Sequence, residues 1–343
     1  MNEHEIIEYI FQKKYKSLSN KVYNWLRINQ RFMSFISEYR DKIRRVIREQ
    51  NNIYQIEDRI IELEVAHLLL LNTRFDIEYE KDKKNGKSQD LFVTFENIHK
   101  FFIEIKHVRM NEYEILFDKF IEEISSEIKS LPFKIYFSIE SNFYNYDRHL
   151  LERINSNKAN IVEFIKKTIS DKYNSLTPGE LNEYQILGFE NEINLLLSKP
   201  EYDTDIINPT VLVPNRRISY TQKEFRKFGD IIFEKIEQIK ENNANLILIY
   251  SDSTTHFKVD LFRAVNNIRK AIDHNDMDFF KKKKTTISSF VNKYKFLSGI
   301  IIISKLKFPS KHENLLWLND YFDTRFIRIP NSALEYLQSM KYL

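Results

Sequence analysis

The sequence contains no cysteine and only 5 glycines among its 343 residues. Without cysteine, the chain has no disulfide framework, no zinc–sulfur or iron–sulfur site and no thiol nucleophile. The scarcity of glycine excludes collagen-like and Gly/Ser-linker classes. We do not expect a disordered chain, because 27 Phe and 19 Tyr provide a large apolar surface to bury. The chain is long enough for one large domain or two ordinary ones, each with its own core.

Long hydrophobic runs are also missing. The longest apolar stretches, around residues 68–71 and 299–303, are far shorter than the roughly 20 residues that cross a bilayer. The first five residues are acidic and lack the basic flank and apolar stretch of a signal peptide. We therefore expect no membrane partner and a cytoplasmic, reducing location.

Positive charge is concentrated in two places, although the net charge is only +4. Residues 1–50 form a predicted helical basic region, in which Arg44, Arg45 and Arg48 lie opposite Ile43 and Ile47 on a helix. This surface is predicted either to be solvated or to contact phosphates. The second concentration is an expected exposed basic loop, Lys281, Lys282, Lys283 and Lys284. Both sets are candidate nucleic-acid-binding residues.

Apolar segments with a strand-like pattern alternate with helical ones along the chain. Strands are predicted near residues 75–80, 90–95, 101–108, 133–139, 183–198, 245–250 and 299–304, and helices near 5–50, 57–72, 112–129, 146–174, 221–241 and 257–273. Buried strands spaced by helices predict an α/β sheet with parallel members. The turn at residues 177–179 is the best candidate boundary, so 177–343 is either a C-terminal α/β extension of the sheet or a second domain.

Three charged residues could carry chemistry. Glu104 and Lys106 lie two apart in a very apolar predicted strand and therefore project from the same face. Charged groups in such a strand need partners, such as a metal ion or another carboxylate. Asp90, at the start of the adjoining strand, could be brought beside Glu104 by a hairpin. Two carboxylates there suit Mg²⁺ or Mn²⁺, and with a nearby lysine they suit the hydrolysis of phosphodiesters.

These residues resemble a known family. Asp90 followed by Glu104-Ile105-Lys106, in a helix-strand-strand-strand-helix-strand context over residues 57–140, resembles the PD-(D/E)xK or restriction-endonuclease-like nuclease superfamily. Gln89 stands where that family usually has proline. The resemblance implies a mixed sheet flanked by helices, with residues 51–176 as the nuclease core. It also implies that Asp90 and Glu104 are metal ligands and that Lys106 is the catalytic lysine of a Mg²⁺-dependent endonuclease.

The same family often adds a glutamate from the preceding helix, for which Glu62 and Glu64 compete. At about 100° per residue, Glu62 projects between Ala66 and Leu69, whereas Glu64 shares a polar stripe with His67. We predict that Glu62 is the auxiliary acid and third ligand. His67 is predicted to lie on the surface and His107 to be a core histidine with satisfied nitrogens.

The sequence therefore predicts a metal-dependent nuclease that hydrolyses DNA, and the resemblance implies bacterial restriction or anti-phage defence. The alternatives are a scaffold of the same fold that binds nucleic acid without catalysis, or an interaction protein whose basic helix docks an acidic partner. DNA is the expected partner, with a second copy of the chain and other subunits of a defence system as further candidates.

Overall fold

A computed structural model describes residues 1–49, 52–79, 90–109, 112–128, 131–141, 148–190, 192–200, 222–252, 257–304, 315–319 and 329–340. The ends of several predicted elements, such as residues 80, 129 and 221, lie outside these ranges. The chain divides into two compact units, one made of residues 1–109 and 225–343 and the other of residues 110–224. Because the second unit is inserted into the first, these bounds differ from the three consecutive ranges predicted from the sequence.

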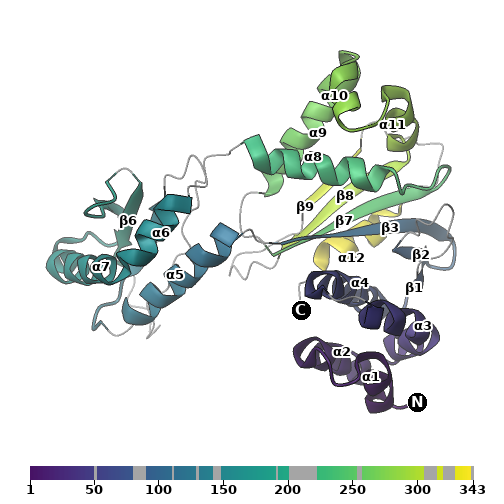
Figure 1. Cartoon of the computed structure of the whole chain (residues 1–343), viewed down its shortest axis with the longest axis horizontal. Coiled ribbons are helices and arrows are strands. Elements are labelled where there is room, and N and C mark those ends of the chain that lie inside the picture. The colour runs from purple at the N-terminus through teal and green to yellow at the C-terminus, as the bar shows by residue number, and fades with distance from the viewer. Residues whose placement is uncertain are drawn as a thin grey trace. The chain divides into compact units, whose positions relative to one another are not determined.

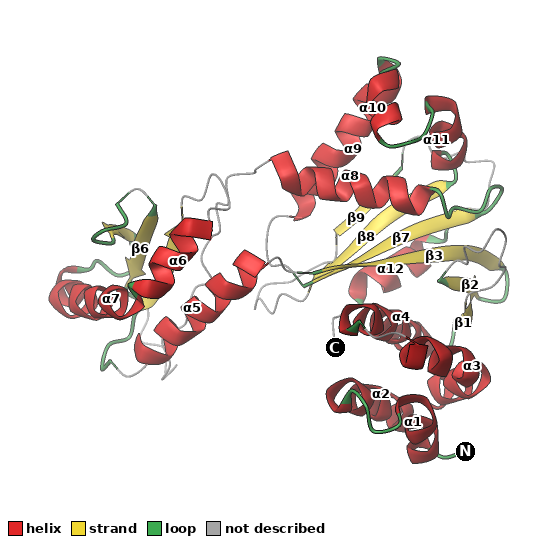
Figure 2. Cartoon of the chain, in the orientation of Figure 1, coloured by secondary structure: helices red, strands yellow, loops and turns green. Residues whose placement is uncertain are grey.

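The first unit is built on a six-stranded mixed sheet (Figure 2), in the order β1 (Phe75–Tyr79), β2 (Leu91–Phe95), β3 (His99–Val108), β7 (Ala244–Ser251), β8 (Leu297–Ser304) and β9 (Leu315–Leu318). Neighbours among β1, β2 and β3 are antiparallel, β3, β7 and β8 are parallel, and β9 is antiparallel to β8. The predicted α/β class with parallel members is therefore confirmed.

Helices cover both faces of this sheet (Figure 1). One face is covered by α3 (Gln30–Glu49), α4 (Ile53–Leu71) and α12 (Asn331–Ser339), and α1 (Glu3–Phe11) and α2 (Lys16–Ile28) pack on α3 and α4 farther from the sheet. The other packs against α8 (Gln222–Ile236), α9 (Phe257–Asp273), α10 (Met277–Lys282) and α11 (Ile287–Tyr294). Ile103 and Ile105 belong to the first core, so the alternation of a strand directs Glu104 and Lys106 toward the helices of the second.

Helix α4 is buried on almost every side, because it lies between α2, α3 and the sheet. Its start is fixed by the side chain of Asn52, which accepts a hydrogen bond from the Tyr54 N–H. The prediction that Glu64 and His67 share a polar stripe, with His67 on the surface, is wrong. Glu64 and His67 are fully buried, and Glu64 accepts hydrogen bonds from Lys21 and Tyr250. The burial of His67 lowers its pKa to about 4.

The turn between β2 and β3 sets the register of the hairpin. Glu96 and Asn97 both have positive φ angles, of 52° and 60°, as the central residues of a tight hairpin turn require. The resulting register pairs Leu91 with Ile103. A slip of one residue would turn every side chain of the strand to the opposite face, so this turn decides which side chains reach the site.

The second unit has its own small antiparallel sheet and core. Its elements are α5 (Glu112–Ile128), β4 (Tyr136–Ser141), α6 (Arg148–Ser156), α7 (Lys158–Lys172), the short helix η1 (Tyr173–Ser175), β5 (Asn182–Gln185) and β6 (Ile193–Ser198). The sheet order is β4-β6-β5, and its apolar residues form a separate core with α5, α6 and α7. Strand β4 thus pairs outside the six-stranded sheet, and the parallel neighbour of β3 is β7 instead.

Within the residues that the structure describes, no helix combines the length and the apolar character needed to span a membrane.

Candidate functional site

Asp90 and Glu104 come together at the β2–β3 hairpin, where the register places Asp90 beside Glu104. Asp90 Oδ2 accepts a hydrogen bond of 2.7 Å from the backbone N–H of Ile105. Glu104 is fully buried, while the side chain of Asp90 is 15% exposed. The structure therefore holds two carboxylates of the predicted site side by side at the edge of a buried region.

A third residue, Lys235 of α8, joins this pair. Its ammonium lies 3.0 Å from Glu104 Oε2 and 3.4 Å from Asp90 Oδ2, and its side chain is only 8% exposed. Lys235 is not among the site residues predicted from the sequence. A signal was present, because Lys235 falls at helical spacing in the apolar stripe that contains Phe228, Ile231 and Ile232. A lysine at an apolar position of a helix indicates a buried ionic partner.

Lys106 projects from the same face of β3 and reaches the neighbouring residue of α8. Its ammonium lies 3.0 Å and 2.9 Å from the two carboxylate oxygens of Glu234. Both partners are substantially exposed, with 33% of the Lys106 side chain and 55% of that of Glu234 accessible to solvent. The two consecutive residues of α8 thus pair with the two charged residues of the Glu104-Ile105-Lys106 motif.

The carboxylate of Glu62 interacts electrostatically with that of Asp90. Burial, followed by repulsion from Asp90, raises the pKa of Glu62 to about 8. Its carboxylate accepts hydrogen bonds from Arg59 and from the hydroxyl of Tyr79, the latter at 3.0 Å. Glu62 is therefore a neighbour of the pair but is held by partners of its own, whereas Glu64 is engaged elsewhere.

The donor set at Asp90 and Glu104 suits a hard divalent cation, since all its ligand atoms are carboxylate oxygens. Glu104 Oε1 is buried and has no hydrogen-bond partner among the described residues, which leaves it available as a ligand. Burial and repulsion by Asp90 raise the pKa of Glu104, while Lys235 opposes this change. However, the described residues contain no group of three or more His, Asp or Glu side chains placed to hold a metal ion.

The carboxyl ends of β3 and β7 hold a separate charged cluster. His107 Nδ1 lies 3.1 Å from Asp58 and Nε2 lies 2.7 Å from Asp252, and Arg109 pairs with Asp58 as well. Burial lowers the pKa of His107, but its hydrogen bonds to Asp252 and Asp58 outweigh this effect and leave the pKa raised. The prediction of a satisfied core histidine is confirmed.

The predicted basic residues of α3 do not all face solvent. The Arg44 guanidinium lies 4.3 Å from the ring centre of Tyr9 in α1, and Arg48 donates a hydrogen bond to the carbonyl of Tyr9. Arg45 is exposed. Arg44 and Arg48 therefore help to join α3 to α1, and Arg45 has the most accessible charge of the three for a polyanion.

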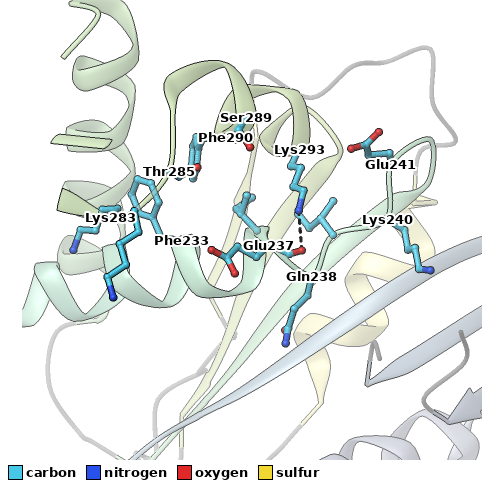
Figure 3. A pocket seen from close by; sticks show the side chains of 13 residues that line it. Phe233, Glu237, Gln238, Lys240, Glu241, Lys283, Thr285, Ser289, Phe290 and Lys293 are labelled. Atoms are coloured by element: carbon cyan, nitrogen blue, oxygen red, sulfur yellow. Dashed lines mark hydrogen bonds between the residues drawn. The ribbon is translucent and has the colours of Figure 1, made fainter. Parts of the chain in front are cut away.

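The predicted basic loop is partly helical, because Lys281 and Lys282 end α10 and only Lys283 and Lys284 lie in the turn after it. Lys283 pairs with Asp230 of α8. Lys283 and Lys284 also line a cavity of about 710 Å³, together with Lys240, Lys293, Glu237 and Glu241 among others. In Figure 3, Lys283 and Lys240 lie at opposite ends of this cavity, with Lys293 donating to the carbonyl of Glu237 between them.

Comparisons with protein-family models, with curated proteins and with solved structures find no match to this chain.

Proposed function

We propose that the chain is a restriction-endonuclease-like, metal-dependent nuclease that hydrolyses phosphodiester bonds of DNA. In this proposal Asp90 and Glu104 hold Mg²⁺ or Mn²⁺, Lys106 contacts the scissile phosphate, and Glu62 is an auxiliary acid. Restriction or anti-phage defence is the proposed setting, on the basis of the family resemblance alone.

The observation that carries the proposal is the placement of the motif residues. Asp90 and Glu104 meet across the β2–β3 hairpin, and Lys106 projects from the same face of β3 two residues later. Buried carboxylates brought this close repel one another, which costs stability. Such an arrangement is typical of sites whose purpose is to bind a cation, and the buried, unbonded Oε1 of Glu104 supports this interpretation.

The reaction would be the addition of water to the phosphorus of a phosphodiester. A new P–O bond forms to the oxygen of the water, and the bridging P–O bond to the leaving alkoxide breaks. A proton from the water passes to this alkoxide. A bound divalent cation would stabilise charge on the phosphate. Lys106, with its exposed ammonium, would bind a nonbridging oxygen in place of Glu234. Glu62, whose raised pKa keeps a proton available, would serve as an acid–base group near Asp90.

DNA as the substrate is supported by lysines next to α8. Lys283 and Lys284 come from the segment that packs on this helix, which also carries Lys235 and Glu234 at the site. Lysines of this kind attract a phosphate backbone without reading sequence.

The testing experiment is cleavage of supercoiled and linear DNA by the purified chain with Mg²⁺, with Mn²⁺ and with chelator. Asp90→Ala and Lys106→Ala should each abolish metal-dependent cutting. Lys293→Ala, at the cavity and away from the motif, should retain the chemistry and is the matched control. Absence of cutting in all conditions, or cutting that survives both motif substitutions, would reject the proposed active site.

A second candidate function is a non-catalytic scaffold that binds nucleic acid or another protein. The specific observation in its favour is that Lys235 already provides Asp90 and Glu104 with a cation, while Arg59 and Tyr79 engage Glu62. Retention of the whole motif favours the enzyme. DNA binding by a chain that never cleaves under the conditions above would favour the scaffold.

A further inference from the structure

Lys235 has an unusual position for a charged side chain. It is almost fully buried, with its ammonium between the carboxylates of Glu104 and Asp90. Moving an ammonium out of water is costly unless an opposite charge compensates. The two carboxylates therefore make the burial of the Lys235 ammonium possible, and the ammonium in turn reduces the repulsion between them.

The cluster nevertheless remains short of positive charge. Two carboxylates face a single ammonium, and Glu104 Oε1 receives no hydrogen bond from the described residues. A cation with two charges would balance this cluster better than an ammonium with one.

A divalent cation that joined the two carboxylates through the oxygens facing Lys235 would have to take the place of its ammonium. Mg²⁺ binds carboxylate oxygens at about 2.0–2.1 Å, and Lys235 lies on the same Oε2 of Glu104 and Oδ2 of Asp90. We propose that Lys235 is a built-in counter-ion that closes the metal-free site, so that a divalent cation must displace it to bind. This inference rests on the proposed function, and it makes Lys235 a positioning residue that sets the affinity for metal.

The displaced ammonium must reach water, because a buried lysine without a partner would be too costly. A lysine side chain can make this movement alone, since its four-carbon stem is flexible. Glu234, the exposed neighbour of Lys235 on α8, lies toward the solvent side. Binding of a cation should therefore convert Lys235 from a shielded amine into an accessible one.

The first test is the affinity of the full-length chain for Mn²⁺, measured by electron paramagnetic resonance. Lys235→Met removes the competing charge at similar length and should bind Mn²⁺ about tenfold more tightly than the wild type, a gain of about 1.4 kcal/mol. Lys235→Arg keeps a competing cation and should show no such gain. Lys293→Met, which lies outside the cluster, should match the wild type. Equal or weaker binding by Lys235→Met would overturn the inference.

The second test uses the unaltered protein and so does not depend on whether the variant folds. Brief acetylation followed by mass spectrometry should modify Lys235 poorly in chelator and at least several-fold more in Mn²⁺, while Lys293 is modified equally in both. Protection of Lys235 that persists in saturating Mn²⁺ would overturn the displacement.

The outcomes separate the two proposals. Mn²⁺ binding that Asp90→Ala abolishes, but that Lys235→Met leaves unchanged, would overturn the counter-ion role and retain the metal site. Lack of Mn²⁺ binding by both the wild type and Lys235→Met would overturn the proposed metal site itself, and the counter-ion role with it.

Discussion

Lys106 and Glu234 form an exposed ion pair in which the ammonium lies within 3.0 Å of both carboxylate oxygens. Exposed pairs of this kind contribute about 0–1 kcal/mol to stability. The pair is therefore easily exchanged for a pair between Lys106 and a phosphate, which is what the proposed function requires of this lysine.

The first prediction concerns Glu234. Glu234→Gln should change the free energy of unfolding by less than about 1 kcal/mol and should increase the affinity for DNA, because Lys106 loses its competing carboxylate. Fluorescence anisotropy with a labelled duplex in chelator, together with chemical denaturation, measures both quantities. Glu335→Gln, at an exposed position on α12, is the control for a simple change in net charge. Weaker binding by Glu234→Gln than by this control would contradict the prediction.

The second prediction separates the structural role of Asp90 from its proposed role in chemistry. Asp90→Ala removes the acceptor for the Ile105 N–H and should cost about 1–3 kcal/mol of stability. Asp90→Asn keeps a side-chain oxygen that can accept this bond and should cost less. Both variants should fail to cleave DNA, since neither has the carboxylate. Denaturant melts and cleavage assays on the same preparations test this, and equal stability of the two variants would argue against a role for the hydrogen bond.

The third prediction is a dependence of stability on pH that comes from Glu62. Burial and Asp90 raise its pKa in the folded state to about 8 from a reference value of 4.5. A group with a raised folded pKa contributes stability that is complete below its unfolded pKa and is lost as the pH rises through the folded value. The contribution of Glu62 to stability should therefore fall between about pH 4.5, its unfolded pKa, and about pH 8, its folded pKa.

Glu62→Gln cannot ionise, so this variant should lose at least about 1 kcal/mol less stability over the same interval. Thermal melts across the pH range give the comparison. Glu335→Gln is again the control, because its side chain is exposed. Parallel pH profiles for Glu62→Gln and the wild type would show that Glu62 ionises normally.

The fourth prediction compares two glycines. An added Cβ at Gly299 of β8 would lie 2.5 Å from the carbonyl oxygen of Trp317 in β9. An added Cβ at Gly229 of α8 would have no neighbouring atom within 4 Å. Gly299→Ala should destabilise the chain by about 1–3 kcal/mol. Gly229→Ala should stabilise it by about 0.5–1 kcal/mol, because alanine favours the helix. Calorimetry on the two variants measures both effects. An unchanged stability of Gly299→Ala would contradict the prediction and mean that β9 can shift away from β8 at little cost.

Local patterns predicted the part of the site that lies on one hairpin. Alternation in a strand placed Glu104 and Lys106 on one face, and the spacing of the strands brought Asp90 near them. The apolar stripe around Lys235 signals a buried partner for this lysine, but the identity of that partner depends on the parallel pairing of β3 with β7, which no local pattern reveals. Glu64 was misjudged for a related reason: a helical wheel assumes one solvent-facing side, and α4 has none over much of its length.

The parallel pairing of β3 with β7 also determines when the site can form. Glu104 is paired with Ile247, which is synthesised only after the whole inserted unit. Contacts between residues so far apart in sequence form slowly, and domains made from a nascent chain tend to fold from the N-terminus onward. A ribosome-bound chain that ends within the insertion therefore carries Asp90 and Glu104 without either β7 or Lys235. The charged centre of the first unit is completed late in synthesis, after the second unit has had time to fold.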